Sequence, residues 1–183
     1  MAKEFKVSRP LIREVLTELK TEGLVEKIPN KGAIVRKLDT SSLFEVMETR
    51  EVLEGLAVRL AAGRTSRKDW KDLEEEFGQP FEMIVKNLEF DKYLDLLTKF
   101  RYRMLEAAGN EELNKMIGSL YSKTKIVQRK IAILPGRIQE ALEEHREVLS
   151  TIMEGNAKKA EEKKRLNMHN ARECLKKYEK WAL

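Results

Sequence analysis

The feature that most constrains the fold is a helical apolar periodicity that continues from Asp39 to the end of the chain. Apolar residues recur every three or four positions, a spacing that places them on one face of an α-helix. Strand signals vanish here, and the periodic runs are separated by glycine, proline or asparagine. The runs lie at about 42–63, 66–77, 89–108, 110–134, 137–153 and 156–183. About six helices with short connections predict a mainly α protein with an antiparallel bundle, and about 145 residues can bury a sizeable core.

Capping residues mark where several of these helices begin. Ser42 with Glu45 has the spacing of a capping box, in which each side chain bonds the backbone N–H of the other residue. The pair Ser66 and Asp69 has the same spacing. Asn110 is expected to cap the next long helix, because its side chain can accept a hydrogen bond from the first turn.

The first part of the chain has a different pattern. Ser8 is a good N-cap, and Pro10 stands just inside it, where a missing N–H costs little. Gly23 suits the end of the same helix, where glycine adopts a left-handed conformation easily. The apolar stripe of this helix consists of Ile12, Val15, Leu16 and Leu19. Residues 1–5 look like the end of an earlier helix.

Two short apolar runs follow, at 24–28 and 33–36, and residues 29–32 join them with the sequence Pro-Asn-Lys-Gly. These residues favour a tight turn, so the runs predict a hairpin with a basic tip. Helix, turn, helix and hairpin together are typical of a winged helix-turn-helix, whose second helix can enter the major groove of DNA. We expect this domain, in partial form, over residues 1–38, and a helical domain over residues 39–183.

Positive charge is concentrated in the same N-terminal segment. Residues 1–37 hold nine basic and five acidic residues, a net charge of +4, whereas the other 146 residues carry a net +1. A short basic segment beside a nearly neutral remainder of the chain indicates a domain that binds a polyanion. Charge alone fits an ordinary solvated surface equally well.

Composition excludes several other classes of protein. No apolar run approaches the ~18–20 residues that cross a bilayer, which rules out a transmembrane protein. The start of the chain lacks the apolar core of a signal peptide, so we expect no export. The single cysteine, Cys174, cannot form an internal disulfide, and two histidines cannot build a zinc-finger framework. These features predict a reduced, cytoplasmic protein without a membrane partner.

The stretch EFKVSRPLIREVLTELKTEGLVEKIPNKGAIVRKL resembles the winged-helix domain of the GntR family of bacterial transcription regulators. It has the valine-serine-arginine start, an Arg-Glu pair four residues on, "EGLV" and a glycine-tipped wing. The resemblance implies contacts with double-stranded operator DNA from Ser8, Arg9, Arg13, Lys31 and Gly32. Arginine can bind guanine edges bidentately, whereas the serine hydroxyl and the wing backbone can bond phosphate.

Two departures from the family pattern concern this domain. Pro10 stands where family members often carry a small polar residue, so one hydroxyl contact is absent. The family domain also has about forty residues before this point, including a first helix, and ~38 residues are fewer than usually fold alone. We expect that this sequence begins after the true start of the winged-helix domain, rather than that the protein carries a vestigial DNA-binding domain.

The helical part resembles the FCD-type effector domain of the FadR branch of GntR regulators. The matching phrases are "REVLEGLAVRLAA" (Arg50–Ala62), "FRYRMLEAAGNEEL" (Phe100–Leu113) and "EEHREVLSTIMEGNAKKAEEKKRLN" (Glu143–Asn167). The resemblance implies a homodimer on a palindromic operator. An effector bound in the helical domain would change the spacing or orientation of the two DNA-binding domains.

Many FCD domains hold a divalent metal with one aspartate and three histidines. At the corresponding positions this sequence has Leu97, Arg101, His145 and Asn167. Leucine cannot ligate, arginine repels a cation, and one histidine with an asparagine holds zinc weakly. We therefore predict no tightly bound metal and no cofactor. A rescue by Asp95 and His169 would require both helices to rotate.

Arg101 can replace the positive charge of the metal by binding a carboxylate or phosphate bidentately. The predicted site for an anionic small molecule, such as a carboxylate, consists of Arg50, Arg101, His145 and Asn167. The alternative is that Arg101 pairs with an internal acid such as Glu54 or Glu144, because buried arginines usually find a carboxylate.

The sequence as a whole predicts a DNA-binding transcriptional regulator, a repressor more often than an activator in this family. A protein that only binds ligand or dimerises, with a head unable to bind DNA, is the alternative. An enzyme finds little support, because there is no glycine-rich phosphate loop, no HExxH motif and no convincing Ser–His–Asp or Cys–His set.

Overall fold

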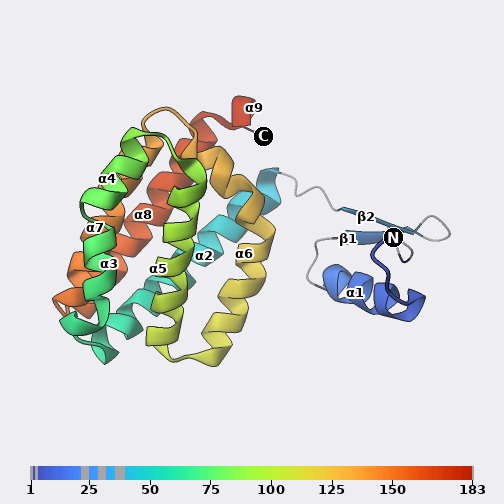
Figure 1. The fold of residues 1–183 in the computed structure, drawn as a ribbon, viewed down its shortest axis with the longest axis horizontal. Coiled ribbons are helices and arrows are strands. Elements are labelled where there is room, and N and C mark those ends of the chain that lie inside the picture. Colours follow the sequence, from blue (N-terminus) through green and yellow to red (C-terminus); the bar gives the residue numbers. More distant parts are fainter. Residues whose placement is uncertain (1, 3, 22–24, 29–31, 36–39, 183) are drawn as a thin grey trace. The chain divides into compact units, whose positions relative to one another are not determined.

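The computed structural model describes residues 2, 4–21, 25–28, 32–35 and 40–182. By its internal contacts the chain divides into two compact units, Met1–Leu43 and Phe44–Leu183. In its described residues the first unit has one helix and two strands of its own, and the second unit is helical (Figure 1). The mainly α fold with a small winged head is therefore confirmed.

The first unit contains α1 (Arg9–Thr21), β1 (Val25–Ile28) and β2 (Gly32–Val35). Oγ of Ser8 accepts a hydrogen bond from the N–H of Leu11 at 3.3 Å, which confirms Ser8 as the N-cap. The strands pair antiparallel as a two-stranded sheet, with Val25 opposite Val35, as the hairpin prediction required. Gly23 and the predicted turn residues 29–31 lie outside the described residues.

The backbone just before α1 has the hydrogen bond that typically closes a helix. Lys6 has a φ of +53°, and the N–H of Val7 donates to the carbonyl of Ala2 at 3.0 Å. A left-handed residue followed by a bond that spans six residues is the Schellman arrangement of a helix C-terminus. This agrees with the expectation that an earlier helix ends here. Val15, however, stays 40% exposed although it belongs to the predicted apolar stripe.

The second unit is a bundle of long helices with short ones between them (Figure 1). Its elements are α2 (Thr40–Arg64), the 3-10 helix η1 (Arg67–Trp70), α3 (Lys71–Glu76), α4 (Gln79–Lys86), α5 (Phe90–Ala108), α6 (Glu111–Ala132), α7 (Arg137–Met153), α8 (Ala157–Lys177) and α9 (Glu179–Ala182). None of the described helices is both long and apolar enough to cross a membrane.

Most of the predicted helix starts are confirmed. Oδ2 of Asp69 accepts hydrogen bonds from the backbone N–H and the hydroxyl of Ser66, both at 2.8 Å. Oδ1 of Asn110 accepts from the backbone of α6 at 3.1 Å. The capping box at Ser42 is wrong, because α2 already begins at Thr40. Three consecutive residues with hydroxyl groups stand there, and spacing alone does not select the one that caps.

Two helices differ from their predicted extents. The last one was expected to run to residue 183, but α8 ends at Lys177 and α9 begins at Glu179. The segment after Gly78, for which no helix was predicted, forms α4, with Pro80 in its first turn. Proline is well tolerated at that position, so here it marks a helix start as well as an interruption.

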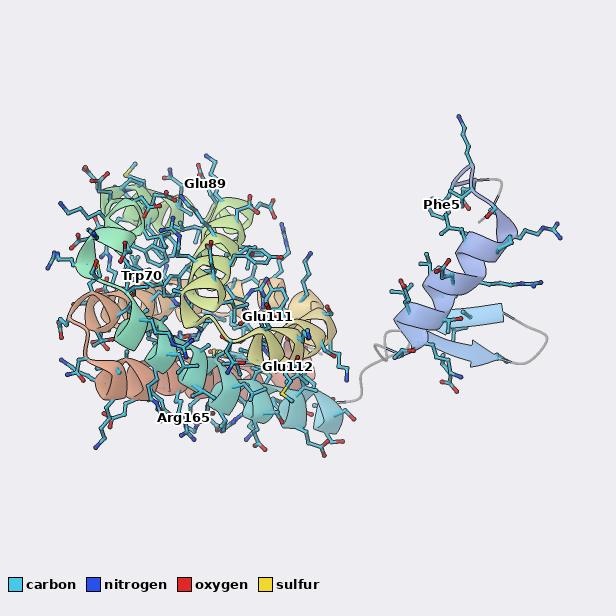
Figure 2. All side chains as sticks on the ribbon, turned by 90° about the horizontal axis from the view of Figure 1, so that it is seen from below. Phe5, Trp70, Glu89, Glu111, Glu112 and Arg165 are labelled. Atoms are coloured by element: carbon cyan, nitrogen blue, oxygen red, sulfur yellow. The ribbon has the colours of Figure 1, made fainter. Side chains whose placement is uncertain are left out.

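An aromatic cluster fills the centre of the second unit. Trp70 is fully buried, and its Nε1 donates to Oγ1 of Thr65 at 2.8 Å; Figure 2 shows it inside the bundle. The ring of Phe100 packs edge-on against Trp70 and Phe77, at 6.2 and 5.4 Å between centroids. Arg146 of α7 donates to the carbonyls of Phe77 and Gly78, and thereby ties the turn between α3 and α4 to the core.

Candidate functional site

The helical unit contains a cavity of about 120 Å³ between α2, α5, α6, α7 and α8. Its wall includes all the residues predicted to bind an effector: Arg50, Arg101, His145 and Asn167. Apolar side chains of α5, such as Leu97, Phe100 and Met104, line it as well. The structure therefore brings together predicted residues that belong to four different helices.

Arg50 is a buried cation of α2, only 6% exposed. Its Nε and Nη2 donate to Oε1 of Glu54 at 3.0 and 2.5 Å, and its Nη1 donates to Oγ1 of Thr124 at 2.5 Å. Burial by itself raises the pKa of Glu54, but the charges of Arg50 and Lys164 lower that pKa to about 2. The Glu54 carboxylate is therefore ionised at neutral pH.

Lys164 of α8 is a second buried cation at the same carboxylate. It is 6% exposed, and its Nζ lies 3.0 Å from Oε2 of Glu54 and 3.4 Å from Oδ1 of Asn167. Two buried cations thus share one carboxylate, which leaves one positive charge without an anion. The other end of the Asn167 amide is also engaged, because its Nδ2 donates to Oε2 of Glu144 at 2.7 Å.

Arg137 is a third buried cation of the cavity wall, and its charge is balanced. Its Nη1 and Nη2 donate to Oε1 and Oε2 of Glu144 at 3.0 and 2.5 Å. This bidentate geometry is the strong form of an arginine–carboxylate pair. Arg137 starts α7 and is 2% exposed, so the pair lies inside the unit.

Sequence reasoning missed both Lys164 and Arg137. A signal existed, because Lys164 precedes Asn167 by three residues and Arg137 precedes His145 by about two helical turns. Each therefore shares a helix face with a residue that was predicted. The pattern could not show that Lys164 is buried while the adjacent Lys163 is not.

Arg101 of α5 stacks on an aromatic ring instead of pairing with an acid. Its guanidinium carbon lies 3.4 Å from the centroid of the Tyr121 ring, and its Nε is buried without a hydrogen-bond partner. Among the described residues, no carboxylate lies within ion-pair distance of Arg101. The alternative that it pairs with Glu54 or Glu144 is wrong, because other cations hold both acids.

His145 of α7 is 7% exposed and lies between aromatic rings. Its ring meets those of Phe77 and Phe100 edge-on, and its Nδ1 is buried without a hydrogen-bond partner. Burial, with the positive charges of Lys164 and Arg137, lowers the pKa of His145 well below 6.5. The imidazole is therefore neutral at pH 7 and offers an unused nitrogen close to the cavity.

A neutral buried histidine makes stability depend on pH. Below pH 6.5 the unfolded chain binds a proton at His145 that the folded chain does not, so the free energy of unfolding falls as pH falls. The folded protein should therefore be less stable at pH 5 than at pH 7. Urea denaturation of His145→Gln should show a correspondingly weaker pH dependence, whereas His169→Gln, at an exposed histidine, should keep that of the parent protein. Equal slopes for the parent and His145→Gln would contradict this assignment.

The residues of the cavity do not fit the metal site that the FCD resemblance implies. The four positions do meet at one cavity, but only His145 among them is a strong metal ligand. The amide of Asn167 is occupied by Glu144 and Lys164, and Arg101 adds a positive charge. The described part of the chain contains no group of three His, Cys, Asp or Glu that could hold a metal ion. Three buried cations and Arg101 therefore favour an anion over a cation at this cavity.

The first unit presents the residues predicted to contact DNA, except Lys31, which lies outside the described residues. Arg9 and Arg13 are exposed and stand one turn apart on α1. Oγ of Ser8 accepts a bond from the backbone, and its hydroxyl hydrogen can still donate. Gly32 has a φ of +102°, which glycine adopts without strain, at the start of β2.

These are the features of a winged-helix regulator with a helical second domain. Residues 1–35 match the family described as "Bacterial regulatory proteins, gntR family", and residues 45–169 match the FCD domain. The chain therefore belongs to the GntR family of bacterial regulatory proteins and carries an FCD domain.

Curated relatives are named as transcriptional regulators. The Nta operon transcriptional regulator of Aminobacter aminovorans is 32% identical over 128 residues, which cover 70% of this chain and 60% of that protein. The regulator LutR of Bacillus subtilis (strain 168) is 24% identical over 200 residues, covering 97% of this chain and 89% of the relative. The chain thus spans less than two thirds of the length of the first of these relatives.

Solved structures show the same fold. E. coli McbR/YncC superposes with a TM-score of 0.80 at 19% sequence identity. The aligned region covers 97% of this chain and 84% of the McbR/YncC chain. The Streptococcus agalactiae GntR protein gives a TM-score of 0.60 at 21% sequence identity, and the aligned region covers 94% of this chain and 85% of that protein's chain.

Proposed function

We propose that this chain is a DNA-binding transcriptional repressor whose activity is set by a small anion bound in the cavity of the helical unit. The observation that carries the proposal is the excess of positive charge at that cavity, above all at Arg101, which no described carboxylate balances. A buried or stacked cation without an anion is costly unless a ligand supplies one. The exposed Arg9 and Arg13 of α1 provide the surface for DNA.

The names of relatives support repression. Two of them are the galactonate operon transcriptional repressor of Escherichia coli (strain K12) and the probable D-xylose utilization operon transcriptional repressor of Paenarthrobacter nicotinovorans. The FCD domain supports the further proposal that the chain belongs to the FadR branch of the family. We further propose that two copies bind a palindromic operator, since two identical heads read two half-sites related by symmetry. A regulator of this kind works in the cytoplasm, where the chromosome lies.

Arg13→Ala is expected to weaken binding to operator DNA about 10- to 100-fold, because a base-contacting arginine contributes about 1–3 kcal/mol. The whole chain is first used to select duplexes from a random-sequence pool. Gel-shift titrations then compare the parent protein and the variant on the selected duplex. A palindromic consensus among the selected duplexes supports two symmetric heads.

The matched control is Lys68→Ala, which removes one exposed positive charge from the helical unit. This variant should bind the selected duplex as the parent protein does. If Arg13→Ala and Lys68→Ala bind alike, α1 is not the helix that reads DNA. If the selection enriches no sequence at all, a ligand-binding protein without DNA activity becomes the better description.

A further inference from the structure

We propose that the helical unit has a DNA-contacting surface of its own, a basic end that binds the phosphate backbone of the duplex read by the winged head. This inference goes beyond the proposed function, which assigns DNA binding to the head alone, and it rests on that function for the identity of the polyanion. It depends on how charge is distributed in the helical unit, on lysines without carboxylate partners and on where those lysines gather.

Charge is unevenly distributed along the helical unit. From Leu113 to Gln139 the chain has six basic residues and no acidic one, whereas the other residues between 38 and 183 carry a net negative charge. The basic segment covers most of α6, the connection after it and the start of α7. The nearly neutral total of this unit therefore conceals a block of positive charge.

Some cations of this block and of the last helices are paired, but several lysines are not. Arg129 contacts Asp91, and Nζ of Lys176 lies 3.0 Å from Oε1 of Glu173. Five exposed or half-buried lysines have no ion pair with any carboxylate in the part of the chain that the structure describes: Lys123, Lys125, Lys130, Lys177 and Lys180. We call these five lysines the basic end.

The basic end combines two segments that are far apart in the sequence. Figure 1 shows the end of α6, the helix α9 and the beginning of α2 at the same end of the helical unit. Nζ of Lys176 lies 5.6 Å from the ring centroid of Phe44, near the start of α2. Pro135, which follows α6, borders one hollow together with Lys177 and Lys180. The positive charges of α6 and of the last helices therefore lie close together.

Helix ends explain only part of this charge. Basic residues are favoured in the last turn of a helix because they interact with its macrodipole, and this effect falls off beyond that turn. It accounts for Lys130 and Lys177, which stand in the last turns of α6 and α8. Lys123 and Lys125 stand about two turns or more before the end of α6 at Ala132. These lysines indicate an anion from outside the unit.

The place of the basic end favours duplex DNA as that anion. Residues 36–39 separate β2 of the head from α2, and four residues extend over at most about 14 Å. A polyanion held by the head is thus tethered to the start of α2 at a high local concentration. Duplex DNA carries one phosphate charge for about every 1.7 Å of its axis, so several lysines can each meet one. Such contacts add affinity and carry no sequence information.

The test compares the whole chain with the triple variant Lys125→Gln/Lys177→Gln/Lys180→Gln. All three side chains are exposed, so the melting temperature should stay within a few degrees of the parent value. Gel-shift titrations at several salt concentrations use the selected duplex and a scrambled duplex of the same length. We expect the variant to bind both duplexes about tenfold or more weakly, because phosphate contacts are common to both. The slope of log K against log salt should become less steep by about 2 or 3 for each bound copy.

The matched control is Lys68→Gln/Lys71→Gln/Lys86→Gln. These lysines of η1, α3 and α4 are also exposed, so the net charge changes by the same amount at a different place. Lys68 and Lys71 each stand directly before an aspartate, and Lys86 follows a glutamate by four residues. This variant should bind both duplexes with the affinity and the salt slope of the parent protein.

Two results would overturn the inference while the head still reads DNA. If the basic-end variant binds like the control, its lysines do not contact DNA, and an acidic protein surface becomes their partner. If it loses affinity for the selected duplex alone at an unchanged salt slope, the lysines act through the head and not on phosphate. Failure of the proposed function is a separate result. In that case the selection enriches no sequence, while the scrambled duplex still reports whether the basic end binds phosphate. A parent protein that binds neither duplex at low salt would overturn both.

Discussion

Glu54→Gln is expected to lower the free energy of unfolding by about 3–5 kcal/mol, because it removes one partner of a buried ionic group. Both Arg50 and Lys164 depend on this carboxylate for their ion pairs, and Glu54 is 1% exposed. A glutamine oxygen can accept a hydrogen bond but cannot balance either charge. For a unit of this size the melting temperature should fall by about 10–15 °C.

The matched control is Glu82→Gln. Its carboxylate pairs with Arg146 at 2.8 Å, but the side chain is 56% exposed. Exposed pairs contribute about 0–1 kcal/mol, so this variant should melt within a few degrees of the parent protein. Thermal and urea denaturation, followed by circular dichroism at pH 7, measure both variants under the same conditions.

A double variant separates charge from packing at Glu54. Adding Lys164→Met to Glu54→Gln removes one of the two cations left unbalanced, so it should recover part of the lost stability. Recovery identifies the buried charge as the cause, whereas additive losses would indicate that Glu54 acts through its shape. If Glu54→Gln itself is as stable as the parent protein, the buried ionic group does not exist as described.

Much of the fold could be predicted because its signals are local. The caps at Ser66 and Asn110 and the breaks at glycine and proline depend on residues within one turn of each other, and the structure confirms them. The start of α2 was misplaced because Thr40, Ser41 and Ser42 all carry a hydroxyl group that can cap. The one start that the spacing predicted, at Ser42, lies inside the helix.

The candidate site was predictable only in part. A family resemblance placed Arg50, Arg101, His145 and Asn167 at one site, and the structure puts all four on one cavity. The partner of Arg101 was not predictable from the sequence. Whether Arg101 pairs with Glu54 or Glu144 depends on which other cations pair with these two acids, and those cations lie on several different helices. Lys164 was hidden in a run of lysines and glutamates whose other charged members are exposed or half-buried. Charge in such a run usually indicates solvated surface. The tertiary structure instead buries this member, beside Glu54 of α2.

Phe100→Ala should produce the second large effect, because this side chain belongs both to the core and to the cavity wall. Phe100 is 2% exposed, and its ring packs against Trp70, Phe77 and His145. Truncation of a buried phenylalanine to alanine costs about 3–5 kcal/mol, from lost burial and from the space left behind. The melting temperature should therefore fall by about 10–15 °C.

Tyr102→Ala is the control on the same helix. Tyr102 lies two residues further along α5 and is 62% exposed, so its truncation should cost less than about 1 kcal/mol. Denaturation in urea at pH 7 compares the two variants with the parent protein. Similar losses for both positions would contradict the assignment of Phe100 to the core.

The same truncation should also change the size of ligand that the cavity accepts. Removing the ring of Phe100 extends the apolar part of the cavity, while Arg101 and the group around Glu54 keep their charges. Affinity should therefore shift from shorter to longer linear carboxylates, for example from butyrate toward hexanoate, measured by calorimetry at a temperature well below the lower melting point. A variant that loses stability but keeps the ligand-length preference of the parent protein would show that Phe100 supports the core without bordering the bound ligand.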